Sequence, residues 1–269
     1  MEDSLWVSLA LLLVAVLFCE GLRWVVRGQL SGGYRSLATE LVSTFQLCCC
    51  VHELRLLAER GASDPNFHLL LVYGVTLLNV LTFGGATCNP NTTLEQLLTG
   101  EASFGGSFQQ LASQFGAALL ARFTMNNVWA QKLSPLHSKG NLECQSGIHT
   151  GSMLFAAAVE AACAFVVQSS LLYLRGSKVK YQAQLLSAII VLLVYAGGHI
   201  TGAVFNQALA FSMYFHCKGN TLLEYVVVYW LGPIIGMVCS VMVFGYIIPM
   251  LKGSRVKKSR YPTSDQKTK

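Results

Sequence analysis

The chain contains the heptapeptide Gly202-Ala203-Val204-Phe205-Asn206-Gln207-Ala208, and a related one, Gly85-Ala86-Thr87-Cys88-Asn89-Pro90-Asn91, lies in its first half. Each heptapeptide follows an apolar block and opens a short segment, at residues 206–217 and 89–99. A helix rises about 1.5 Å per residue, so about 11 residues enter a 30 Å hydrocarbon layer without crossing it. These two segments are therefore predicted to be re-entrant half-helices.

A second feature of the sequence indicates that the two halves of the chain are an internal repeat. Each half carries one carboxylate early in its first core helix: Glu40 precedes Asn89 by 49 residues, and Glu160 precedes Asn206 by 46 residues. Three membrane crossings per half would give the two halves opposite orientations, which makes the repeat an inverted one.

The composition is that of a membrane protein. Of 269 residues, 53% are hydrophobic and 12% are charged, with a mean hydropathy of +0.50, whereas a soluble domain carries about 25% charged residues. The apolar residues gather in blocks of about 20, the length that crosses a bilayer as a helix. The blocks cover residues 5–26, 37–58, 67–86, 108–130, 153–174, 185–204 and 222–251.

We therefore expect an all-α membrane protein with six transmembrane helices, two re-entrant half-helices and an extra N-terminal hydrophobic helix. The expected divisions are residues 1–34, a signal-anchor-like hydrophobic segment; 35–131, a first repeat with half-helix 89–99; 132–151, a lumenal connecting loop; 152–251, a second repeat with half-helix 206–217; and 252–269, a basic cytoplasmic tail.

The distribution of charge predicts the orientation. Acidic residues precede the first block and Arg23 and Arg27 follow its apolar core, which favours a retained signal anchor with a lumenal N-terminus over a cleaved signal peptide. The net charge of +6 does not indicate nucleic-acid binding, because the basic residues lie at block edges and in the tail. The cytoplasmic group comprises Arg23, Arg27, Arg35, Arg175, Lys178, Lys180, Lys252, Arg255, Lys257, Lys258 and Arg260, and the scattered lumenal group comprises Arg60, Lys132, Lys139 and Lys218.

The heptapeptides suit the start of a helix inside a membrane. The first N–H groups of such a helix have no partner in hydrocarbon. Asn is a favoured N-cap, and Pro fits the first helical position because its missing N–H costs nothing there. Two caps meeting near the midplane would direct positive dipole ends and two amide donors into one passage. The predicted pore motif is Asn89, Pro90 and Asn91 with Asn206, Gln207 and Ala208, and the small residues Gly85, Ala86, Gly202 and Ala203 would allow close helix packing.

A carboxylate inside a membrane costs free energy, so Glu40 and Glu160 are expected to be hydrogen-bonded. Either they relay protons in a transporter, or each braces the backbone of the re-entrant loop in its own half. Their equivalent positions, with no basic partner expected, favour bracing.

The nine cysteines show no spacing typical of disulfides or metal sites. Cys48, Cys49 and Cys50 are consecutive within an apolar block and suit small buried side chains. The sequence also shows no nucleophile–base set and no phosphate-binding loop, so we predict no catalytic residue, no metal and no cofactor.

These residues resemble the aquaporin superfamily, and within it the unorthodox, or super-aquaporin, branch. The resemblance covers about residues 29–251 and rests on the second heptapeptide with the residues before it. It rests further on Thr44-Phe45-Gln46-Leu47-Cys48-Cys49-Cys50, His52-Glu53-Leu54, Leu193-Val194-Tyr195-Ala196-Gly197-Gly198 and Val228-Tyr229-Trp230-Leu231. The resemblance implies a pore in each subunit, a homotetramer, residence in the endoplasmic reticulum, and passage of water with glycerol and hydrogen peroxide. It also implies a role in assembly for Cys217.

Two departures from the family pattern bear on selectivity. Gln207 stands where the family has Pro, which predicts a looser cap and an extra donor near the pore. Leu209 stands where water-selective members have Arg, which predicts a wider and more apolar constriction. Candidate filter residues are Tyr73, expected as an aromatic wall although packing is the alternative, with Val194, Ala203 and Leu209.

The function expected is a passive channel for water and small neutral solutes in an intracellular membrane. A poorly conducting structural or organelle-homeostasis protein is the second possibility, and a coupled transporter on an inverted repeat is the third.

Overall fold

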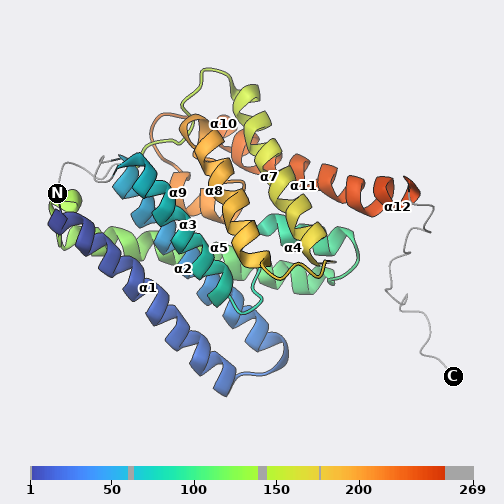
Figure 1. The fold of residues 1–269 in the computed structure, drawn as a ribbon, viewed down its shortest axis with the longest axis horizontal. Coiled ribbons are helices and arrows are strands. Elements are labelled where there is room, and N and C mark those ends of the chain that lie inside the picture. Colours follow the sequence, from blue (N-terminus) through green and yellow to red (C-terminus); the bar gives the residue numbers. More distant parts are fainter. Residues whose placement is uncertain (1, 60–63, 139–143, 176, 252–269) are drawn as a thin grey trace.

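The computed structural model describes residues 2–59, 64–138, 144–175 and 177–251. In these residues the long helices are α1 (Glu2–Gln29), α2 (Gly32–Glu59), α3 (Pro65–Thr82), α5 (Phe104–Ala130), α7 (Met153–Arg175) and α8 (Gln182–Thr201). A last helical run comprises α10 (Leu222–Val226), α11 (Gly232–Met242) and α12 (Ile248–Leu251), joined by π-helical turns at Val227–Leu231 and Val243–Ile247 (Figure 1). The predicted tail, 252–269, lies outside the described residues.

Two short helices, α4 (Pro90–Leu98) and α9 (Gln207–Tyr214), follow α3 and α8 at the predicted half-helix positions. Another short helix, α6 (Pro135–Ser138), lies in the loop between the halves. The second half-helix ends earlier than expected, at Tyr214, so Cys217 lies in the turn beyond it.

Six helices of the described chain are long and apolar enough to cross a membrane: Ser4–Gln29, Gly32–Glu59, Pro65–Thr82, Met153–Arg175, Gln182–Thr201 and Leu222–Leu251. The predicted block 108–130 forms α5, which is long enough to cross a membrane. It is not among the six, because its glutamines lower its hydropathy. Gln114 of α5 is fully buried and donates to Glu40, so this polarity is directed into the protein.

The helices pair as an inverted repeat predicts. In the first half α2 packs along α5, in the second half α7 packs along α11, and α3 lies against α8 where the halves meet. The contact between α7 and α11 is the closest, because Gly232 and Gly236 of α11 bring its backbone onto that of α7.

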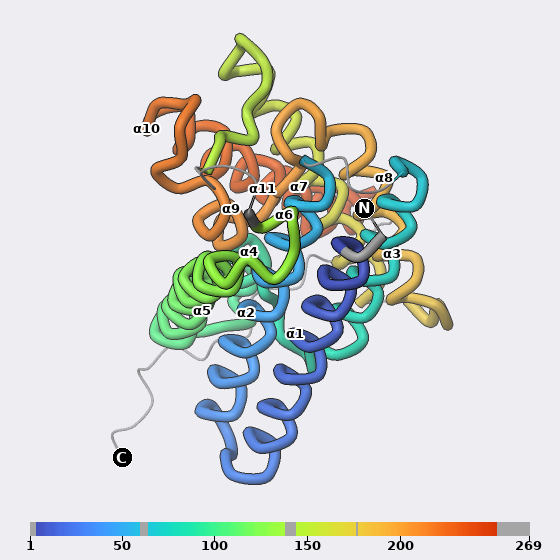
Figure 2. Tube along the Cα trace, turned by 90° about the vertical axis from the view of Figure 1, so that its left-hand side faces the viewer, coloured from blue at the N-terminus to red at the C-terminus, as the bar shows by residue number. Residues whose placement is uncertain are grey.

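The N-terminal helix α1 lies antiparallel beside α2 (Figure 2). Its Arg23 is 1% exposed and donates to Gln46 at 2.7 Å and to Ser43 at 3.4 Å, both on α2. The sequence shows the charge of Arg23 but not the buried acceptors on α2 that face it, and its place among the cytoplasmic charges stays a prediction. Breaking these contacts while Arg23 stays buried would leave a cation without its partners, which is strongly destabilising, so they favour the packing of α1 on α2.

Candidate pore

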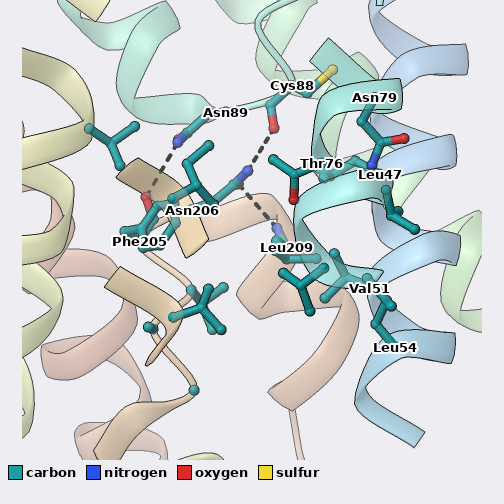
Figure 3. A pocket seen from close by; sticks show the side chains of 18 of the residues that line it. Leu47, Val51, Leu54, Thr76, Asn79, Cys88, Asn89, Phe205, Asn206 and Leu209 are labelled. Carbon is teal, nitrogen blue, oxygen red and sulfur yellow. Dashed lines mark hydrogen bonds between the residues drawn. The ribbon is translucent and has the colours of Figure 1, made fainter. Parts of the chain in front are cut away.

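A cavity of about 910 Å³ runs through the region where the two halves meet. It is lined along α3 from Pro65 to Phe83 and along α8 from Leu186 to Gly202. Since α3 has 18 residues, the cavity extends over about 27 Å, close to the thickness of a hydrocarbon layer. Both predicted asparagines, Asn89 and Asn206, line it (Figure 3).

The two asparagines are N-caps with nearly the same backbone geometry. Asn89 has φ −146° and ψ 119°, and its side chain accepts from Asn91 N. Asn206 has φ −146° and ψ 113°, and its side chain accepts from the N–H groups of Ala208 and Leu209. Each half-helix thus begins inside the protein with its first N–H groups partly satisfied by its own asparagine.

The caps also bind across the repeat. Asn206 Nδ2 donates to the carbonyl oxygen of Cys88 at 2.7 Å, and Asn89 Nδ2 donates to that of Phe205 at 3.3 Å (Figure 3). Cys88 and Phe205 have positive φ angles, 53° and 39°, a conformation that non-glycine residues rarely adopt. These two residues precede the caps, and their turned carbonyl groups join the starts of the half-helices to each other.

A buried carboxylate holds each of these turns. Glu40 accepts from Cys88 N at 2.6 Å and from Thr87 N at 3.0 Å. Glu160 accepts from Phe205 N at 2.6 Å and from Val204 N at 3.1 Å. Glu40 is 2% exposed and Glu160 is 0% exposed. The two carboxylates therefore satisfy loop N–H groups that have no partner in a regular element.

The two unusual motif residues, Asn91 and Gln207, contact each other. Gln207 Nε2 donates to Asn91 Oδ1 at 2.7 Å, and Asn91 Nδ2 donates to the carbonyl oxygen of Phe205 at 3.2 Å. Gln207 is 1% exposed and Asn91 is 2% exposed, and neither lines the cavity. The expected looser cap was wrong, because the Asn206 cap matches the Asn89 cap. The extra donor expected from the backbone N–H of Gln207 stays a prediction, while its side-chain amide is used between the half-helices.

The losses caused by replacing the two partners of this contact should not be additive. We expect Asn91→Ala and Gln207→Pro each to lower the free energy of unfolding by about 1–3 kcal/mol, because each leaves a buried amide without its partner. The double variant should lose less than the sum, since Pro suits the first helical position after an extended Asn206. Thermal unfolding in detergent measures all four proteins, and strictly additive losses would contradict the coupling.

Three of the four filter candidates line the cavity: Val194, Ala203 and Leu209. Tyr73 is not among the lining residues, so its expected place in an aromatic wall stays a prediction. The lining residues of α3 include Leu69, Thr76 and Val80, which stand about 40°, 60° and 20° from position 73 around the helix. Tyr73 therefore lies on or beside the lining face of α3, and its 16-residue spacing to Asn89 locates the helix but not the direction of the side chain.

Several polar lining residues were not predicted from the sequence. Thr76 and Asn79 line the cavity from α3, and Arg55 and Arg175 line it near the ends of α2 and α7. Asn79 accepts from Gln46 Nε2 at 2.7 Å, which links the lining of the cavity to the buried contacts of α1. A polar residue on an apolar crossing helix was the available signal for Asn79.

Cys144 and Cys217 form a disulfide, with a Cα–Cα distance of 4.9 Å and a sequence separation of 73 residues. The spacing of the cysteines did not indicate this disulfide, because spacing along the chain does not report pairs that the fold brings together. The backbones beside the disulfide also pair: Lys218 N donates to Cys144 O at 3.0 Å, and Ser146 N donates to Lys218 O at 2.7 Å. This pairing attaches the loop between the halves to the end of the second half-helix.

Comparison with known proteins agrees with this arrangement. The family model described as Major intrinsic protein matches residues 66–244. The chain is 35% identical to aquaporin-11 of Mus musculus, with 94% of each chain covered. It is 37% identical to aquaporin-12 of Mus musculus, with 97% of this chain and 93% of that protein covered.

Among solved structures, the aquaglyceroporin from Plasmodium falciparum matches with a TM-score of 0.66 at 14% identity, covering 83% of this chain and 100% of that chain. At this identity the match concerns the fold alone, and it is the fold expected from the inverted repeat. Together with the family model and the identities above, it shows that the chain belongs to the major intrinsic protein family, the family of the aquaporins.

Proposed function

We propose that the protein is a passive membrane channel for water and small neutral solutes, with glycerol and hydrogen peroxide among them. The observation that carries the proposal is the pair Asn89 and Asn206, which meet in a cavity that follows the whole length of α3. Membership of the major intrinsic protein family supports the same function.

The chemistry of the pair suits a neutral solute. Each amide nitrogen carries two hydrogens, and one is accounted for by the carbonyl group of the opposite half. The second can donate to the oxygen of a passing solute. The N-terminal ends of α4 and α9 add positive potential at the same place, which disfavours cations.

The lining around the pair supports solutes larger than water. Leu209, Val194 and Ala203 are apolar, and Leu209 stands where a fixed arginine would otherwise narrow the passage. An apolar wall interrupted by Thr76 and Asn79 suits molecules that have both carbon and hydroxyl groups, as glycerol has.

We further propose that the channel lies in the endoplasmic reticulum membrane as a homotetramer, with its C-terminus in the cytoplasm. Compartment and assembly rest on the resemblance to the unorthodox branch. The orientation rests on the positive charges and on the disulfide Cys144–Cys217, which suits an oxidising lumen. Cys217 would then support assembly by fixing the end of α9 rather than by pairing between subunits.

Purified protein in liposomes tests the channel. Under an osmotic gradient, we expect shrinkage faster than that of empty vesicles for water, glycerol or peroxide. Leu209→Trp should return the rate to that of empty vesicles, because the larger side chain fills the passage. Leu192→Trp is the matched control: Leu192 lies on α8 with 65% of its surface exposed and does not line the cavity, so this variant should conduct as the unmodified protein does.

Two other outcomes of the liposome experiment would favour the alternative functions. Vesicles that behave as empty ones for every solute would contradict the channel and favour a poorly conducting structural protein. Uptake that depends on a sodium or proton gradient would favour a coupled transporter.

A further inference from the structure

One mouth of the cavity lies where α2 ends and α3 begins, and we call it the α2 mouth. It includes lining residues from α2, from α3, from the loop between the halves and from α9. These are Arg55, Glu59, Pro65, Gly147, His149 and Tyr214.

Arg55 is held in place from three sides. Its Nη2 donates to the carbonyl oxygen of Gln145 at 2.8 Å, and its Nε is paired with Glu59 one turn further along α2. Its guanidinium carbon lies 4.5 Å from the centroid of the Tyr214 ring, within range of a cation–π interaction. Tyr214 is itself stacked on Tyr229 at 5.0 Å. With a side chain 18% exposed, Arg55 is a fixed cation that faces the passage.

The inverted repeat supplies a counterpart at the other end. Arg55 follows Glu40 by 15 residues, and Arg175 follows Glu160 by 15 residues. Each arginine lines the cavity and contacts the half-helix of the opposite half: Arg55 reaches Tyr214 of α9, and Arg175 reaches Glu95 of α4.

The two arginines differ in how their charge is balanced. Both terminal nitrogens of Arg175 bind the carboxylate of Glu95, at 2.9 and 3.3 Å, and that side chain is 1% exposed. Glu101 lies 3.6 Å from the same guanidinium. Among the described residues, Arg55 is paired with one carboxylate, Glu59, which is 50% exposed and therefore screened by water. The other titratable groups of the described chain that line the α2 mouth and α3 near it are Tyr214, His149 and His68.

We infer that Arg55 sets the charge preference of the α2 mouth, disfavouring small cations and favouring neutral or electron-rich solutes. It provides, from α2, a positive group on the side of the passage where Leu209 provides none. A fixed charge at an entrance with protein walls acts strongly on entering solutes. The consequence for permeation rests on the proposed channel function, but the electrostatic potential at the mouth can be measured without any flux.

Cysteine modification measures this potential directly. His149 is exposed at the α2 mouth, so His149→Cys places a reactive thiol there. In detergent, the rates of modification at position 149 by ethylsulfonate and ethylammonium methanethiosulfonates are compared, each relative to a free thiol. Mass spectrometry of the peptide separates this thiol from the native cysteines.

Arg55→Gln in this background should lower the ratio of anionic to cationic rates severalfold. A unit charge acting in water over a distance on the order of 8 Å would change the ratio for two oppositely charged reagents about fivefold. Glu59→Gln should raise the ratio by removing the opposing charge. Arg55→Lys, which retains the charge, should stay near the parent. Lys132→Gln, which removes a charge from a residue outside the cavity lining, should change the ratio less than twofold.

An unchanged ratio in a folded Arg55→Gln protein would overturn the inference, as would a fall with Glu59→Gln. If Arg55→Gln does not fold, the Glu59→Gln and Arg55→Lys ratios decide it on their own. Inactive liposomes would contradict the proposed channel without affecting this measurement.

Discussion

Replacing Gly236 with valine is expected to prevent the protein from folding. A Cβ atom at this position would lie 2.8 Å from the backbone nitrogen of Phe165 and closer still to the carbonyl oxygen of Ala161. Both are backbone atoms of α7, so neither can rotate away. The neighbouring Gly232 has the same restriction, with Ala157 O at 2.7 Å from the added Cβ. Separating α7 from α11 should lower the free energy of unfolding by more than about 4 kcal/mol.

Size-exclusion chromatography after detergent extraction measures the effect as the yield of monodisperse protein. Gly245→Val is the matched control, because it makes the same change in the same helical run at a position where an added Cβ meets nothing within 4 Å. The costs of helix propensity therefore cancel in the comparison. Equal yields and equal unfolding temperatures for the two variants would contradict the close contact.

Much of this architecture could be predicted from the sequence because a membrane allows few kinds of backbone structure to cross it. Apolar length locates a crossing helix, and a segment too short to cross must be re-entrant. The repeated Gly-Ala-x-x-Asn pattern identifies the two half-helices as equivalent parts of a repeat. The hydropathy of α5 is too low for the same argument, since its glutamines serve buried acceptors such as Glu40.

What the sequence could not predict depends on rotation about helix axes and on contacts between distant segments. The spacing of Tyr73 from Asn89 locates it on α3, but spacing alone does not give the direction of its side chain. Cys144 and Cys217 are 73 residues apart. The loop that brings Cys144 to Cys217 has no regular sequence pattern. Arg55 lies near a helix end, as many charged residues do, and only the fold brings Tyr214 and Gln145 around it.

The contact between Gln207 and Asn91 shows a further limit. Taken singly, Gln207 in place of Pro reads as a weaker cap, and Asn91 reads as an unrelated variation. Their side chains meet across the repeat, where Gln207 provides the donor and Asn91 the acceptor of a hydrogen bond of 2.7 Å. Two residues that depart from a motif are therefore better judged together when the motif is duplicated.

Removing the carboxylate of Glu160 is the other change expected to have a large effect. Its oxygens accept from Thr201 Oγ1 at 2.6 Å, from Val204 N at 3.1 Å and from Phe205 N at 2.6 Å. Glu160→Ala would leave these three donors buried without a partner. The free energy of unfolding should fall by about 3–5 kcal/mol, because each stranded donor retains its desolvation penalty.

Thermal unfolding in detergent measures this loss, with Glu101→Ala as the control. Glu101 has a side chain 60% exposed, and its ion pair with Arg175 at 3.6 Å should contribute less than about 1 kcal/mol. A Glu160→Ala protein that unfolds at the temperature of the control would contradict the bracing role.

The same variants separate bracing from proton relay. A relay group must exchange its proton during transport, so replacing it should abolish proton-coupled flux while the fold survives. A bracing group must remain a fixed acceptor, so the fold should fail and any flux through the intact protein should not depend on a proton gradient. Glu160→Gln sharpens the distinction, because glutamine retains one acceptor oxygen but turns a donor toward the loop. We expect it to recover only part of the stability lost with alanine, whereas a relay that needs no bracing would leave both variants as stable as the unmodified protein.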